Sequence, residues 1–256
     1  MIIVKRVILF MLTGWIGTSL AGQNLLDQQG RKTGPWVDHY PGGNIRYEAT
    51  FMEGRPVGLM VRYDDAGRVT ARMMFDSTSN RCYTKLFHQG GKLAAEGWHV
   101  EQQKDSVWTY YSAYDGTVRM RENYQAGKLD GKVYRYYPGG GVSEETNWTG
   151  NLREGEWMQY YENGNPRLRG HYMDDLLQGP YTVWYPDSVK MISGQYRMNL
   201  TEGTWRYFDE SGKLMHSIDY KDGRPVDKEA YEKLMIKTMD SLLIVNPETE
   251  QNPFQQ

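Results

Sequence analysis

Apolar and polar residues alternate with a period of two along much of the chain. Residues 45–51 carry Ile, Tyr, Ala and Phe at alternate positions, with Arg, Glu and Thr between them. Residues 118–124 show a similar alternation, with Arg119, Arg121 and Asn123 on the polar side. Because successive side chains of a strand point to opposite faces, the pattern predicts strands with one core face and one solvated face. The sequence therefore predicts an all-β fold.

The alternation is organised in units of about 24 residues. With the first residue of each unit counted as position zero, the eight units start at Gly34, Gly58, Cys82, Ser106, Gly131, Gly155, Gly179 and Gly203. Position five is a ring in every unit: His39, Tyr63, Phe87, Tyr111, Tyr136, Tyr160, Trp184 and Phe208. Another ring recurs near position seventeen: Phe51, Phe75, His99, Tyr124, Trp148, Tyr172, Tyr196 and Tyr220. This periodicity predicts a repeat protein.

Each unit is predicted to form a β-hairpin. Loops such as Pro41-Gly42-Gly43 hold three residues and end in glycine, as a type I turn followed by a left-handed residue favours. This loop length fixes the register, so position five faces position eleven across the hairpin. The predicted pairs are Tyr63 with Val69, Phe87 with Leu93, Tyr136 with Val142 and Phe208 with Leu214. Joined head to tail, the hairpins predict an elongated antiparallel β-meander of about 16 strands.

Composition divides the chain into five segments. Residues 1–21 are a predicted signal peptide, 22–33 an N-terminal lead, 34–225 the repeat domain, 226–245 a C-terminal α-helix and 246–256 a disordered tail. Asp227 is expected to cap the helix, whose apolar residues recur at helical spacing. The helix is expected to cover one end or face of the sheet.

The first 21 residues have the three zones of a secretory signal. Lys5 and Arg6 precede an apolar stretch, and Ser19-Leu20-Ala21 is a small-residue cleavage site. The apolar stretch is shorter than the ~20 residues of a membrane-spanning helix, which favours cleavage over a retained anchor. We therefore expect an exported protein, periplasmic or at the cell surface, with no transmembrane segment after signal cleavage.

Charge and motifs argue against several functional classes. Removal of Lys5 and Arg6 takes the formal net charge from −2 to −4, and no basic block remains, so nucleic acid is not an expected partner. The five histidines fall at different offsets without metal-ligand spacing, and no nucleophile elbow, phosphate loop or calcium loop occurs. We expect no catalytic residue, no metal and no cofactor. Cys82 is expected to be a small buried residue.

Position two holds a large apolar residue in most units. The row is Trp36, Met60, Trp108, Val133, Trp157, Tyr181 and Trp205. Carried through the hairpin, the expected register places it on the solvated face, opposite the core. Aromatic residues among charges are typical of binding hot spots, so the predicted partner-binding residues are Trp36, Trp108, Trp157, Tyr181 and Trp205. The alternative is that arginine stems or the C-terminal helix cover the row, which would then be structural.

Three serines that follow aspartate are candidate O-glycosylation sites. Ser77, Ser106 and Ser188 lie where turns are predicted, and each Asp-Ser pair precedes a small or apolar residue. This resembles the O-glycosylation signal of one group of Gram-negative bacteria. Asp-Ser is also good turn chemistry, which is the alternative explanation.

The unit pattern resembles the bacterial variant of the MORN repeat. Unit six matches best, with Gly155, Trp157, Tyr160, Tyr161 and the turn residue Gly164. The resemblance covers roughly residues 34–225, and units three and four depart from it most. Proteins with this repeat are often described as YwqK-like antitoxins, and related MORN repeats serve as scaffolds, so the resemblance implies binding rather than catalysis.

These observations predict a non-catalytic, protein-binding or scaffold module of the bacterial cell envelope. An antitoxin-like role fits an exported chain only as immunity against an envelope or exported toxin. The alternative is a glycan- or cell-wall-binding protein, with peptidoglycan as the ligand and the aromatic rows as stacking platforms.

Overall fold

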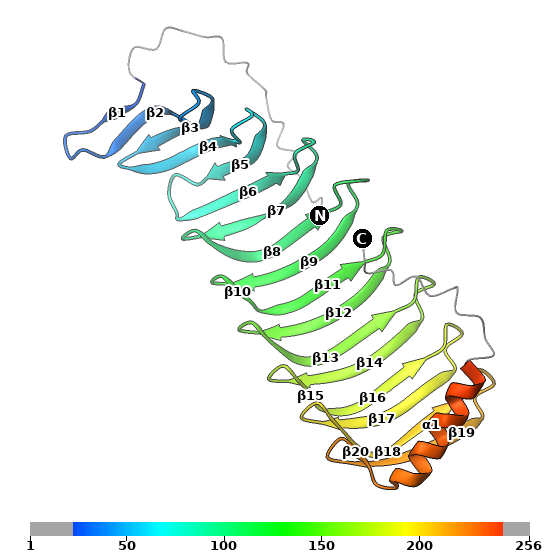
Figure 1. The fold of residues 1–256 in the computed structure, drawn as a ribbon. Coiled ribbons are helices and arrows are strands. Elements are labelled where there is room, and N and C mark those ends of the chain that lie inside the picture. Colours follow the sequence, from blue (N-terminus) through cyan, green and yellow to red (C-terminus); the bar gives the residue numbers. More distant parts are fainter. Residues whose placement is uncertain (1–22, 243–256) are drawn as a thin grey trace, which may run out of the picture.

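The computed structural model describes residues 23–242, with side chains up to residue 235. These residues form one open antiparallel sheet of 20 strands and a single C-terminal helix. Figure 1 shows the sheet as a long ladder, with the helix at its C-terminal end. The predicted all-β fold, an elongated meander of hairpins, is confirmed. The predicted signal peptide and tail lie outside the described residues.

Sixteen strands of six to nine residues make up most of the ladder. They are β2 (Lys32–His39), β3 (Ile45–Met52), β4 (Arg55–Tyr63), β5 (Val69–Phe75), β6 (Arg81–Phe87), β7 (Leu93–Val100), β8 (Gln103–Tyr111), β9 (Val118–Gln125), β11 (Gly131–Tyr136), β12 (Val142–Thr149), β13 (Leu152–Tyr160), β14 (Pro166–Met173), β16 (Gly179–Trp184), β17 (Lys190–Arg197), β18 (Leu200–Phe208) and β19 (Leu214–Lys221). Four two-residue strands complete it: β1 (Leu25–Leu26), β10 (Lys128–Leu129), β15 (Leu176–Leu177) and β20 (Arg224–Pro225).

Neighbouring strands pair in chain order. All four predicted pairs of position five with position eleven are confirmed, for example Tyr63 with Val69 and Phe208 with Leu214. In each of these hairpins the register shifts by one residue just before position five, as between Arg62 and Tyr63. The extra residue is a β-bulge beside the loop.

A second bulge explains the glycine at position zero. Gly58 and Gly203 have φ values of 65°, in the left-handed region that glycine adopts without strain, and the register shifts beside them. Ser106 holds the same conformation without being glycine, at 58°. At Cys82 the bulge is absent, because β5 and β6 pair without any shift. The two units that lack the glycine thus depart from the repeat in different ways.

Two-residue turns join most successive units. Both residues of these turns have positive φ, as at Glu101 and Gln102 (50° and 68°) and at Met198 and Asn199 (52° and 67°). This is the type I′ geometry that matches the twist of a hairpin. Asp174 and Asp175 form another such turn, with φ values of 49° and 65°.

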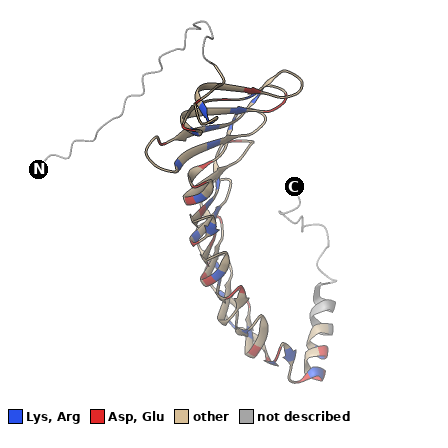
Figure 2. Cartoon of the chain, turned by 90° about the vertical axis from the view of Figure 1, so that its left-hand side faces the viewer, with Lys and Arg blue, Asp and Glu red and all other residues tan. Residues whose placement is uncertain are grey.

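The helix α1 (Lys228–Leu242) begins where the sequence predicts. Asp227 caps it, since its Oδ1 accepts a hydrogen bond of 2.9 Å from the backbone N–H of Ala230. Figure 2 shows that the sheet bends along its length and that α1 lies on the inner side of the bend. Tyr231 packs edge-on against Tyr220 of β19, with ring centroids 6.5 Å apart.

The two faces of the sheet differ in composition. One face, the aromatic face, carries all the most buried side chains: Tyr47, Ala49, Phe51, Ala71, Cys82, Thr84, Ala95, Trp108, Val133, Thr146, Leu168, Tyr172 and Trp205. The other, the charged face, carries ion pairs between neighbouring strands, such as Lys85 with Glu96 at 3.3 Å and Arg169 with Glu156 at 2.6 Å. The position-five rings also lie on the charged face, where the Tyr111 hydroxyl donates to Glu96 over 2.6 Å.

Candidate binding surfaces

The predicted partner-binding row lies on the aromatic face, so its expected placement on the solvated face was wrong. Trp36 pairs directly with the buried Ala49, and Trp205 with Ile218. The pairing of position five was predicted correctly, but the bulge beside the loop adds one residue. A one-residue shift exchanges the two faces of a strand, and the row moves to the core.

Two tryptophans of the row are packing residues. Trp108 is 1% exposed, and its indole lies so close to Gly97 that a Cβ there would be 2.6 Å from the ring. Trp205 is 5% exposed and covers Gly194 in the same way, at 2.3 Å. Each indole N–H is also satisfied by backbone, since Trp108 donates to the Trp98 carbonyl over 2.8 Å. These contacts join each unit to the one before it.

The other members of the row, Trp36, Trp157 and Tyr181, are half-buried. Trp36 donates from Nε1 to the Leu25 carbonyl over 3.0 Å, which ties the N-terminal lead to unit one. Tyr181 packs at 5.7 Å from Trp205, measured between ring centroids. Tyr181 and Trp205 of the row are therefore in contact, whereas Thr84 occupies the same position in unit three.

The three candidate glycosylation serines are all exposed, but only two lie in loops. Ser77 is in the loop between β5 and β6, and Ser188 takes the turn-glycine position between β16 and β17 with φ of 69°. Ser106 lies inside β8 rather than in the predicted turn. The turn was misplaced because Ser106 occupies the inter-unit bulge, which interrupts a strand without ending it.

A strip of exposed apolar side chains crosses the charged face of units two to four. Leu59 pairs with Met74, Met74 with Tyr83, and Tyr83 with Trp98, whose ring is 5.1 Å from that of Tyr83. Trp98 pairs in turn with Asp105 on β8, and the exposed Val107 lies on the same face two residues further along that strand. Leu59, Met74 and Val107 are 51%, 46% and 46% exposed. Isolated exposed apolar residues are ordinary, whereas a contiguous row across the four strands β4 to β7 is typical of an interaction site.

The apolar strip is specific to this part of the repeat. The corresponding cross-strand pairs in other units are Pro35 with Thr50, Lys132 with Asn147, Pro180 with Gln195 and Thr204 with Asp219. The strip was not predicted, because the pattern that the units share lies at positions two, five and seventeen. The signal was present at positions one and sixteen, which are apolar or aromatic together only in units two and three.

On the aromatic face, Lys32 of the N-terminal lead is enclosed by rings of unit one. The Lys32 Nζ lies 4.4 Å from the Trp36 ring centroid, 5.0 Å from that of Phe51 and 5.3 Å from that of Tyr47. It also donates a 2.6 Å hydrogen bond to the Tyr47 hydroxyl. An ammonium held over aromatic faces is attracted by the negative charge of the rings.

The rings of unit four enclose Lys104, at the end of unit three, in the same arrangement. The Lys104 Nζ lies 4.9, 5.1 and 4.8 Å from the rings of Trp108, Tyr110 and Tyr124. The Tyr124 hydroxyl donates to Glu122 over 2.7 Å, so a carboxylate balances the ammonium. Burial, and then the hydrogen bond to Glu122, raise the pKa of Tyr124 to about 12.

Cys82 is buried, as predicted. Its Sγ lies 3.6 Å from the Thr84 hydroxyl, which is 3.0 Å from Nδ1 of His99. Burial raises the pKa of the Cys82 thiol, and burial followed by the nearby Lys104 charge lowers the pKa of His99. Both groups are therefore neutral near pH 7, which describes a structural hydrogen-bonded chain rather than a thiolate nucleophile.

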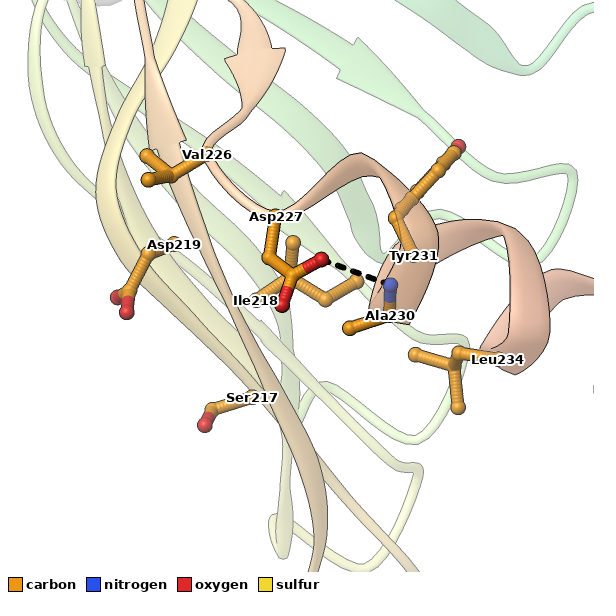
Figure 3. Close-up of a pocket in the computed structure, with 8 residues that line it drawn as sticks. All are labelled: Ser217, Ile218, Asp219, Val226, Asp227, Ala230, Tyr231 and Leu234. Atoms are coloured by element: carbon orange, nitrogen blue, oxygen red, sulfur yellow. Dashed lines mark hydrogen bonds between the residues drawn. The ribbon is translucent and has the colours of Figure 1, made fainter.

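A small cavity of about 180 Å³ lies between β19 and α1. Figure 3 shows Ile218 pointing from β19 toward Ala230 and Leu234, with Asp227 and Tyr231 beside them. Among residues 23–242 no group of three His, Cys, Asp or Glu side chains is placed to hold a metal ion. No helix in the same range is long and apolar enough to cross a membrane.

Comparison with known proteins finds the MORN repeat variant at two places in the chain. The matched residues are 153–174 and 201–222, in units six and eight. No curated protein sequence matches the chain. Among solved structures, the chain is similar to part of the crystal structure of TcdB2-TccC3-TEV, with 14% identity over 77% of this chain and 12% of that one, and a TM-score of 0.20. A likeness this distant carries no functional argument.

Proposed function

We propose that this chain is a non-catalytic scaffold of the bacterial cell envelope that binds a protein partner through the apolar strip. The MORN repeat variant suggests a repeat-based binding or scaffold module. The apolar strip, from Leu59 to Val107, is the observation that carries the proposal. An aromatic and aliphatic patch at the centre of a charged face has the composition of a protein-binding hot spot.

The charges beside the strip favour a partner with acidic residues. Arg81 stacks on Trp98, with Cζ 4.7 Å from the ring centroid, and Arg72 stacks on Phe87 at 5.6 Å. Neither guanidinium has a carboxylate within 4.0 Å among the described side chains. Both are available to an acidic side chain that docks beside the apolar contact.

Capture from envelope extract tests this function. The variant Met74→Ser/Trp98→Ser should lose the partner that the wild-type chain retains and remain folded with a modestly lower Tm, because Met74 and Trp98 are 46% and 36% exposed. The matched control, Asn147→Ser/Gln195→Ser, alters the same positions of units five and seven. Equal capture by both variants would show that the strip is not the binding surface.

Glycan binding is the second candidate function, and the partly exposed, adjacent rings of Trp98 and Tyr83 favour it. Co-sedimentation with purified peptidoglycan separates the two. Sedimentation that depends on Trp98, with no protein captured, would assign a glycan ligand. If the captured partner is an exported toxin and this chain neutralises it, the immunity-like form of the protein-binding function is assigned.

The envelope location rests on the secretory signal in the sequence. N-terminal sequencing of native protein should give a start near Gly22 or Gln23, and a start at Met1 in the cytoplasm would contradict export. The intact mass tests glycosylation at Ser77, Ser106 and Ser188. A mass equal to that of the mature polypeptide would make them structural serines.

A further inference from the structure

The aromatic arrangement that encloses Lys104 recurs in unit eight without a lysine. Trp205, Tyr207 and Tyr220 stand at the ladder positions that Trp108, Tyr110 and Tyr124 occupy in unit four. Both final tyrosines pair with the first residue of their unit, Tyr124 with Ser106 and Tyr220 with Gly203.

The residue at the position of Lys104 is identified by its strand partner. Lys104 pairs with His99 across the turn that precedes unit four, and Thr201 pairs with the corresponding Tyr196 across the turn that precedes unit eight. Threonine carries no charge, so Thr201 cannot take the place of the lysine ammonium over the rings. Among the described residues, no lysine or arginine lies over Trp205, Tyr207 or Tyr220.

The unit-eight ring set has two further differences from unit four. Ile218 stands opposite Trp205, where Glu122 stands opposite Trp108. Glu122 therefore has no counterpart opposite Trp205. His216 stacks on Tyr207 with ring centroids 4.6 Å apart, and Asp227 lies beside Ile218 in the cavity that Tyr231 lines. Tyr231 of α1 adds a fourth ring, at 74° to Tyr220. It also lines the cavity between α1 and β19.

We propose that Trp205, Tyr207, Tyr220 and Tyr231 form a binding site for a trimethylammonium group supplied from outside the chain. A methylated ammonium requires no hydrogen bond and is attracted by ring faces, which suits a ring set that lacks the counterparts of both Lys104 and Glu122. This site is on the opposite face from the apolar strip and does not depend on it. The group could be carried by a trimethylated lysine of a protein or by the headgroup of a choline lipid.

Calorimetric titration of the full mature chain with choline chloride tests the site. The expected dissociation constant is on the order of millimolar, because each ring contributes modestly. The neutral isostere 3,3-dimethylbutanol should bind at least ~10-fold more weakly, since it lacks the charge. Equal binding of the two compounds would overturn the proposal.

Introducing a lysine at the position in unit eight that corresponds to Lys104 gives the sharpest control. Thr201→Lys should fill the site with its own ammonium, as Lys104 does in unit four, and abolish choline binding. Tyr220→Leu should weaken it by ~10-fold or more while keeping apolar volume. Unchanged binding in Thr201→Lys, confirmed as folded by its circular dichroism, would place the ligand elsewhere and overturn the assignment.

Two further titrations identify the source of the group. A peptide containing trimethyllysine and vesicles of phosphatidylcholine are each compared for wild type and Thr201→Lys. Loss of peptide binding in the variant assigns a protein source, and loss of vesicle binding assigns a lipid source. If neither probe binds the wild-type chain and choline does not bind either, the proposal fails.

Discussion

The hydroxyl of Tyr161 donates a 2.6 Å hydrogen bond to the carbonyl oxygen of Trp184, in the next unit along the sheet. The same contact joins Tyr40 to Tyr63, Tyr137 to Tyr160 and Tyr185 to Phe208, over 2.9, 2.7 and 3.0 Å. His88 makes an equivalent contact with the Tyr111 carbonyl at 3.2 Å. Position six thus links neighbouring hairpin loops, a role that the sequence analysis did not assign.

We expect Tyr161→Phe to remove this link while leaving the ring in place. The cost should be about 1 kcal/mol, the usual net value of one intramolecular hydrogen bond. The measurement is the free energy of unfolding from urea denaturation. Tyr114→Phe is the matched control, because that side chain is 89% exposed, and it should have no effect. An equal loss in both variants would show that the Tyr161 contact contributes nothing specific.

Gly194→Ala should destabilise the protein strongly. A Cβ at residue 194 would lie 2.3 Å from the Trp205 ring, so the indole must move out of its buried position. Overpacking of this kind costs about 1 to 3 kcal/mol, and the fixed position of the indole favours the upper end. Thermal unfolding compares it with Gly42→Ala, where a Cβ meets nothing within 4 Å. A Tm drop of similar size in the Gly42 control would refute the packing explanation.

Ser106→Gly should stabilise the protein. Ser106 holds φ of 58° at a position where other units use glycine, and an L-residue in that region costs about 1 kcal/mol or more. The loss of the Ser106 hydroxyl bond to Asp105, at 2.9 Å on the surface, offsets part of the gain. Urea denaturation should show a higher midpoint for Ser106→Gly. The control Ser77→Gly should show no rise in the midpoint, because Ser77 is outside the left-handed region. A lower midpoint for Ser106→Gly would mean that its bulge is not strained.

Residues that obey the period of two were predictable from sequence, and those next to bulges were not. The pairing of Tyr63 with Val69 follows from the loop length alone, and the buried positions Tyr47, Ala49 and Phe51 follow from alternation. The face of Trp36 was predicted wrongly because one extra residue enters beside each hairpin loop. Sequence patterns do not show such a residue, since both strands remain regular on either side of it.

The apolar strip and the lysine sites were missed for a different reason. Leu59 and Trp98 differ from their counterparts in the other units, so a search for what the units share passes over them. The ring sets around Lys32 and Lys104 each combine residues from two neighbouring strands, β2 with β3 and β8 with β9. Their proximity depends on register across both bulges, which only the structure supplies.

Acid should weaken the hairpin loop of unit four through Asp115. Hydrogen bonds from the Thr117 backbone and hydroxyl lower the pKa of Asp115 from 3.8 to about 2. The folded state therefore favours the ionised form, and its contribution is present above pH 3.8 and lost as pH falls through about 2. Asp115→Asn should reduce the difference in urea midpoint between pH 5 and pH 2. An unchanged difference would show that Asp115 does not contribute to acid sensitivity.

Deleting unit six, Gly155 to Gln178, should leave a shorter folded protein. The deletion joins Glu154 to Gly179, and Gly155 and Gly179 both have positive φ, of 99° and 80°, at corresponding bulges. The Tyr137 hydroxyl, which now donates to the Tyr160 carbonyl, would then donate to the Trp184 carbonyl, so the contact between loops is preserved. Because stability in such an array is close to a sum of unit and neighbour terms, one unit can be removed without loss of the others.

Removal of residues 155–166, half of the unit, supplies the contrast. It takes away one strand, so every later strand would run in the opposite direction to its expected neighbour and present the wrong side chains to each face. Circular dichroism and thermal unfolding should show a cooperative β-fold for the 24-residue deletion and loss of structure for the 12-residue deletion. If both deletions unfold the protein equally, the sheet folds as a single cooperative whole and the repeat units do not contribute separately to stability.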